Sequence, residues 1–236
     1  MSRPNDDGLE MLGDIPDSLD ADVSAAKAPP SARIPVDVGP TRQALFRRRL
    51  LALGGALAWV AIQVAALGLR TDMARLGQLY LVLHIGVPLA LAALALAVAL
   101  WPGRSGLGAR VTAVAGVTAV SVGLFIVINV AVPQPFPFVD PYGLTFWQWA
   151  VDCFDVTFVL GAAPLLFVSL TLRRTFVTGA LVRSAAVGLA CGLSGAAMMN
   201  THCENVENPH MLAAHGLPAL VLTFLGAMFV RKVARA

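Results

Sequence analysis

One short stretch of the chain, residues 198–215, combines thiol, imidazole and carboxylate side chains between two long apolar runs. Thiolate and imidazole are ligands that suit Zn or Cu, and carboxylates can complete such a shell. The same thiol could also take part in redox chemistry. We therefore expect a sensing or binding site in this stretch. Its candidate residues are His202, Cys203, Glu204, Glu207, His210 and His215.

The sequence contains three cysteines, of which Cys153 and Cys203 are predicted at the same membrane surface. Cys191 lies among Gly and Ala inside an apolar run and is expected to pack between helices. Two thiols at one surface can form a disulfide if their Cα atoms come within about 7 Å. No CxxC or HExxH motif is present. Three alternatives are therefore open: a Cys153–Cys203 disulfide, a metal held by Cys153, Cys203, His202 and His210, and two unrelated thiols.

The composition indicates an integral membrane protein, because 57% of the residues are hydrophobic and only 13% are charged. Soluble domains carry about 25% charged residues. The apolar residues form six runs, each close to the ~20 residues that a helix needs to cross a bilayer. Since the runs show no alternating pattern, the predicted fold is all-α, a bundle of six transmembrane helices. The predicted helices cover about 50–69, 78–101, 111–132, 153–171, 180–200 and 211–230.

Basic residues alternate between the predicted loops and so predict the orientation of the helices. Six helices leave seven loops and ends. Three of these loops contain no basic residue other than Arg70 and Arg75, and these three loops should face outward. Both termini are then cytoplasmic, and the link 201–210 lies in the compartment where disulfides persist. The basic residues predicted on the cytoplasmic side are Arg42, Arg47, Arg48, Arg49, Arg104, Arg110, Arg173, Arg174, Arg183, Arg231, Lys232 and Arg235.

Residues 1–45 are predicted to form a cytoplasmic tail, and residues 46–236 the transmembrane domain. The tail is acidic and rich in proline, a composition typical of disordered segments. It is either a solvated tail or a segment that folds onto a partner through an apolar side. The apolar residues at helix-like spacing that would form this side include Leu9, Leu12, Ile15 and Leu19.

Several short motifs occur in a characteristic order along residues 40–236. They are Arg47–Arg49 before the first helix, the segment Gly68–Ala74 after it, Cys153 followed by Pro164 and Arg173–Arg174, the triplet His202–Cys203–Glu204, and the basic end Arg231–Lys232. Together these motifs resemble the NrsF-like negative regulators of extracytoplasmic-function sigma factors, which are six-helix anti-sigma factors of the bacterial inner membrane.

The resemblance implies that Cys153 and Cys203 take part in sensing and that the cytoplasmic N-terminus holds the sigma factor. We therefore expect a membrane-bound anti-sigma factor rather than an enzyme, without direct contact to nucleic acid. It would release an extracytoplasmic-function sigma factor on an outward redox or metal signal, with either a disulfide or Zn or Cu at the site. His202, Glu204, Glu207 and His210 would surround Cys203, and His215, about one turn into the last helix, completes the predicted sensing residues.

The rival interpretation is a membrane thiol-redox protein, a metal- or haem-binding protein, or a carrier. The missing CxxC motif argues against an oxidoreductase. The lack of an evident inverted repeat, and of charged residues near the middle of any apolar run, argues against a carrier. Co-purification of a sigma factor would separate the two interpretations.

Overall fold

The computed structural model describes residues 41–100, 111–132, 142–172 and 179–230, together with residues 138, 140 and 232. The predicted partner-binding residues Leu9, Leu12, Ile15 and Leu19 lie outside this part of the chain. The described part is helical and contains no strand. Its elements are α1 (Arg42–Leu67), η3 (Met73–Arg75), α2 (Gln78–Leu81), η4 (Val82–Gly86), α3 (Val87–Leu100), α4 (Val111–Ala131), α5 (Phe146–Thr171), α6 (Ala180–Asn200), α7 (Asn208–His210), η5 (Met211–Gly216), α8 (Leu217–Leu225) and η6 (Gly226–Val230).

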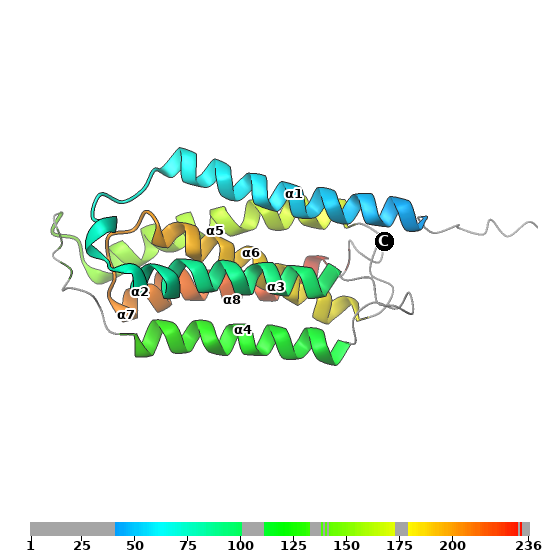
Figure 1. Ribbon diagram of the computed structural model, residues 1–236. Helices are drawn as coiled ribbons and strands as arrows, with labels where there is room; N and C mark the ends of the chain where they lie inside the picture. The colour runs from blue at the N-terminus through cyan, green and yellow to red at the C-terminus, as the bar shows by residue number, and fades with distance from the viewer. Residues whose placement is uncertain are drawn as a thin grey trace, which may run out of the picture. The chain divides into compact units, whose positions relative to one another are not determined.

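Six of the described helices are long and apolar enough to cross a membrane, which confirms the predicted fold class. Two of them are built from consecutive elements, α2 to α3 and α7 to η6, each containing π-helical turns. Figure 1 shows the helices lying side by side in one bundle. We call the end where α1 and α6 end, and where α5 and α7 begin, the cluster end. The spanning segments are Gln43–Leu67, Gln78–Leu100, Val111–Ala131, Phe146–Thr171, Ala180–Asn200 and Asn208–Phe229.

Helix α5 begins at Phe146, seven residues before the predicted start at residue 153. A capping box explains this start: the Thr145 side chain accepts from the backbone N–H of Gln148, whose own side chain accepts from the Thr145 backbone N–H. Trp147 and Trp149 therefore lie in the first turn of the helix. Cys153 consequently lies about two turns inside α5.

Helix α6 is the centre of the bundle and contacts α3, α5 and α8 (Figure 1). Glycines allow these close approaches. A Cβ atom at Gly188 would lie 2.2 Å from the Leu222 carbonyl oxygen, and one at Gly192 would lie 2.5 Å from the Ala219 Cα atom. In a bilayer, helices associate largely through such close backbone packing. As a result, 78% of the most apolar stretch of α6 is buried.

Helix α1 lies at the periphery, with only 11% of its most apolar stretch buried. A proline in α5 creates one of its attachments. Pro164 has no N–H, so the Leu160 carbonyl lacks its helical partner. Trp59 Nε1 and Gln63 Nε2 of α1 donate to this carbonyl oxygen, at 2.9 and 2.8 Å. Helix α1 is therefore held by these hydrogen bonds and by an apolar stripe along one side, which consists of Ala52, Ala56, Val60, Val64 and Leu67.

Candidate functional site

Two thiols and two imidazoles meet in a buried cluster near the cluster end. Cys153 comes from α5, Cys203 from the link between α6 and α7, His210 from α7 and His215 from η5. One ligand atom of each lies within 4.8 Å of those of the other three. The two Sγ atoms are 3.6 Å apart, and Cys203 Sγ is 3.4 Å from His210 Nε2. Both cysteines are free thiols, and all four side chains are buried.

Local backbone structure places Cys203 and His210. The Cys203 N–H donates to the Met199 carbonyl at 2.7 Å, which directs the chain inward at the end of α6. The Asn205 side chain then accepts from the Glu207 N–H at 3.0 Å, a turn typical of asparagine. Pro209 lies in the first turn of α7, where its missing N–H is tolerated. His210 follows directly and points back to the cysteine.

The π-helical segment η5 brings the second imidazole onto the same face. His210 and His215 are five residues apart, and in an α-helix neighbours on one face are three or four apart. A π-helix instead closes i→i+5 hydrogen bonds. The two rings accordingly contact each other edge to face, with centroids 5.4 Å apart.

Asn200 determines which nitrogen of His215 carries the proton. The Asn200 amide nitrogen donates to the His84 carbonyl oxygen at 2.7 Å, and a carbonyl can only accept. The Asn200 oxygen therefore faces His215 Nδ1, with which it forms a short hydrogen bond, so Nδ1 is the donor. Nε2 of the neutral ring then keeps its lone pair, and this atom is buried without a hydrogen-bond partner.

Arg70 connects the cluster to α1. Its buried guanidinium donates to the Cys203 carbonyl at 2.5 Å and to the Glu204 carbonyl at 3.1 Å. It also donates twice to the Asp72 carboxylate, at 2.5 and 2.7 Å. The Arg70 backbone N–H donates to the Thr201 carbonyl at 2.9 Å. The segment that follows α1 is thus fastened to the link that carries Cys203.

Electrostatic interactions at the cluster end favour the anionic forms of Cys203 and Asp72. The hydrogen bond with the Cys153 thiol, and after it the one with His210, lowers the pKa of the Cys203 thiol well below its usual value, although burial acts in the opposite direction. The hydrogen bond from Arg70 lowers the pKa of Asp72 below its usual value of 3.8. A cysteine whose thiolate is favoured in this way is a better metal ligand and nucleophile than an ordinary buried thiol.

The structure brings together four of the seven predicted sensing residues. The other three lie outside the cluster: His202 and Glu204 are exposed, and Glu207 is half-buried. Of the four predicted metal ligands, His202 is therefore separate from the other three. His215 occupies the place in the cluster that was predicted for His202. Cys191 is buried in the apolar core around α6.

Arg70, Asp72 and Asn200 were not predicted as site residues. A signal for Arg70 was present, because it is one of two basic residues in predicted outer loops that are otherwise free of them. Asn200 lies at the end of an apolar run, where a polar residue is interpreted simply as the end of the membrane helix. Its role depends on contacts with residues 15 and 116 positions away.

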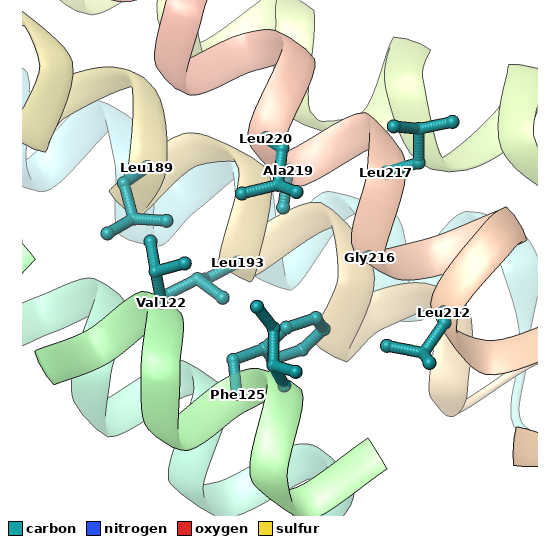
Figure 2. Close-up of a pocket in the computed structure, with 10 residues that line it drawn as sticks. Val122, Phe125, Leu189, Leu193, Leu212, Gly216, Leu217, Ala219 and Leu220 are labelled. Atoms are coloured by element: carbon teal, nitrogen blue, oxygen red, sulfur yellow. The ribbon is translucent and has the colours of Figure 1, made fainter. Parts of the chain in front are cut away.

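A separate pocket of about 230 Å³ lies between α4, α6 and the helix formed by η5 and α8 (Figure 2). Its lining includes Phe125, Leu193 and Leu212, and every lining side chain is apolar. Such a pocket has no polar group to orient a ligand or to bind an ion. The cluster of thiols and imidazoles is therefore the candidate functional site.

Comparison with protein-family models matches residues 35–235 to NrsF, described as the negative regulator of sigma F. Neither the curated proteins nor the solved structures give a significant match. The family match includes all four residues of the cluster and the Arg70 contacts, and it agrees with the resemblance in the sequence motifs. Since it covers most of the sequence, the chain belongs to the NrsF family.

Proposed function

We propose that this protein is an anti-sigma factor of the bacterial inner membrane that releases its sigma factor in response to an outward signal at the cysteine cluster. The partner is a sigma factor of the extracytoplasmic-function type, held by the cytoplasmic N-terminal tail. The observation that carries the proposal is the 3.6 Å contact between the Cys153 and Cys203 sulfurs, which joins α5 to the link between α6 and α7. The family description supports the regulatory role.

A connection from the cluster to the tail supports the signalling step. Arg70 binds the backbone of the Cys203 link and lies three residues after the end of α1. The first residue of α1, Arg42, lies at the end of the tail in the sequence. A signal that moves Cys203 therefore acts on the segment that anchors α1. Release requires that the signal binds two packings of the bundle with different free energies. Movement of a peripheral helix is a suitable difference between two such packings.

The chemistry of the tail supports a basic partner. Its acidic residues complement the positive charge of a DNA-binding protein. Leu9, Leu12, Ile15 and Leu19 at helix-like spacing provide an apolar side that could enter a groove on that partner. Binding of the tail would hold the sigma factor at the membrane without contact to DNA.

Co-purification of the sigma factor with detergent-solubilised protein tests this function. The full chain should retain the sigma factor, and a chain without residues 1–45 should lose it while still inserting into the membrane. Leu12→Asp and Ile15→Asp should weaken retention, because they place charge on the docking side. Val36→Asp adds the same charge outside the apolar pattern and serves as the matched control. Undiminished retention by the truncated chain would remove the tail from the interface, and absence of any sigma factor would favour the thiol-redox or carrier interpretation.

Reporter fusions test the orientation that the signalling model needs. A reporter after Ala236 should be active only in the cytoplasm, and one inserted at Asn208 only outside. The opposite result at either position would place the cysteine cluster on the wrong side for an outward signal.

A further inference from the structure

We propose that Cys153, Cys203, His210 and His215 form a closed tetrahedral site for one divalent thiophilic cation, Zn²⁺. The role of this ion as the ligand of a sensor depends on the function proposed above. Its binding is a separate property of the cluster and is tested without any sigma factor.

Two distances within the cluster are close to those that Zn²⁺ requires. Zn–S bonds of about 2.3 Å and Zn–N bonds of about 2.05 Å with tetrahedral angles separate two sulfurs by about 3.8 Å, and a sulfur from a nitrogen by about 3.6 Å. The corresponding separations here are 3.6 Å between the sulfurs and 3.4 Å between Cys203 Sγ and His210 Nε2. A disulfide would need the sulfurs at about 2.05 Å. In this structure the two thiols are therefore not bonded to each other and lie close to the separation of two zinc ligands.

The nitrogen lone pair of His215 is directed and unused. The Asn200 side-chain oxygen accepts a hydrogen bond from Nδ1–H, which leaves Nε2 as the ligand atom, and Nε2 is buried without a hydrogen-bond partner. Asn200 is itself held by the His84 carbonyl at 2.7 Å. Metal-binding histidines almost always donate their second N–H to such a group, which sets the ring orientation and the tautomer. An empty cluster leaves this buried lone pair unsatisfied, and a metal would satisfy it.

Charge balance in a buried site favours a divalent ion. On binding, the Cys153 and Cys203 thiols each release one proton to solvent, and the two thiolates neutralise Zn²⁺. A neutral assembly is needed because the cysteines pack against the apolar side chains Met198, Met199 and Ala214. Monovalent Cu⁺ with two thiolates would leave one negative charge buried. Mg²⁺ and Ca²⁺ are excluded because they prefer oxygen ligands.

Four protein ligands would complete the coordination shell, which is the arrangement of structural rather than catalytic zinc sites. The ion would hold α5, the α6–α7 link and η5 together at one point. Its presence or loss would therefore change the packing of the link to which Arg70 is attached.

Titration of the purified, reduced and metal-free full chain with Co²⁺ tests the site. Co²⁺ replaces Zn²⁺ in tetrahedral sites and gives absorption bands from thiolate-to-cobalt charge transfer. We expect these bands to saturate at one ion per chain and to disappear when Zn²⁺ is added. Absence of the thiolate bands with the wild-type chain would overturn the proposal whatever the variants do, and so would displacement of Co²⁺ by Cu⁺ but not by Zn²⁺.

Variants identify the ligands. His215→Ala and Cys153→Ser should each weaken binding by more than about 100-fold, and Asn200→Leu by about 10- to 100-fold because it removes the partner of a ligand. His202→Ala, an exposed histidine in the same link, and Cys191→Ser, a buried cysteine outside the cluster, should bind as wild type. Equal losses in these two controls would show that the ion binds elsewhere.

Retention of the sigma factor by the same preparations separates this proposal from the proposed function. Thiolate–cobalt bands with no sigma factor retained in either the metal-free or the Co²⁺-loaded preparation would refute the anti-sigma role and leave the metal site intact. A retained sigma factor with no bands would refute the metal site alone.

Discussion

Replacing Arg70 with methionine should open the link that carries Cys203. Methionine keeps much of the length of the side chain but removes all the hydrogen bonds of the guanidinium. The buried Cys203 carbonyl then loses its donor, which costs about 1–2 kcal/mol. The Asp72 carboxylate loses its bidentate partner, which costs about another 1–2 kcal/mol, since Asp72 keeps some contact with water. The Glu204 residue is exposed, so water replaces Arg70 at its carbonyl.

The two losses together destabilise the closed link by about 3 kcal/mol, which raises the population of its open form about 100-fold. Maleimide labelling of Cys203 reads this population, because the closed form buries its sulfur. The measurement uses detergent-solubilised protein carrying Cys153→Ser, so that Cys203 is the reactive thiol near the link. Arg70→Met should accelerate labelling about 100-fold, while labelling of Cys191 in the bundle should not change.

Arg75→Met is the matched control, because it removes the same charge from an exposed position of the neighbouring segment η3. Labelling is measured at neutral pH, where the ion pair between Arg70 and Asp72 is intact. Arg70 lowers the pKa of Asp72, so the ion pair stabilises the closed link fully at pH values above 3.8, the usual pKa of the carboxyl. This stabilisation is lost as the pH falls through the lower pKa that Asp72 has in the folded protein. Wild-type labelling rates in Arg70→Met, or an equal acceleration in Arg75→Met, would refute the role of Arg70 as the fastening of the link.

Two further predictions concern helix packing and the thiol pair. Gly192→Ala should lower the stability of the bundle by about 1–3 kcal/mol in thermal unfolding, because the new Cβ atom would lie 2.5 Å from the Ala219 Cα atom. Gly123→Ala is the control: no atom lies within 4 Å of the new Cβ atom, so this variant should be neutral or slightly stabilising. Equal effects at the two glycines would contradict this account of packing. In a sigma-dependent reporter assay with oxidant or metal, Cys153→Ser and Cys203→Ser should give the same output and the double variant no more, because the two sulfurs are 3.6 Å apart and we propose that they act as one unit. Additive effects would show that they act separately.

The helices could be predicted from the sequence because their lengths and apolar composition are set by the bilayer. The start of α5 could not be predicted from hydropathy, since Trp147, Gln148 and Asp152 interrupt the apolar run. The capping box at Thr145 and Gln148 was a readable signal for it. Hydropathy thus locates a membrane helix but not its polar first turns.

Most residues of the site could be predicted from the sequence, but their arrangement in space could not. The cysteines, His210 and His215 were all among the candidates, because titratable groups inside a bundle are rare. His202 was expected as a metal ligand since it is adjacent to Cys203 in sequence, yet its side chain is exposed at the end of α6. His215 is twelve residues from Cys203 and reaches the cluster through the π-helical turn of η5, which no spacing rule for α-helices anticipates.

The unequal burial of the helices indicates which element a signal can move. Displacing α6 would separate the close backbone contacts that its glycines make with α8 and α5. Displacing α1 would exchange a small buried area for lipid, which solvates apolar side chains almost as well as protein does. The contacts to be broken are the apolar stripe of α1 from Ala52 to Leu67, Gly55 against the Phe167 ring, two hydrogen bonds at the Leu160 carbonyl, and the Arg70 fastening. These contacts are fewer than those that α6 makes, so α1 is the element that we expect to carry a signal from the cysteines to the tail.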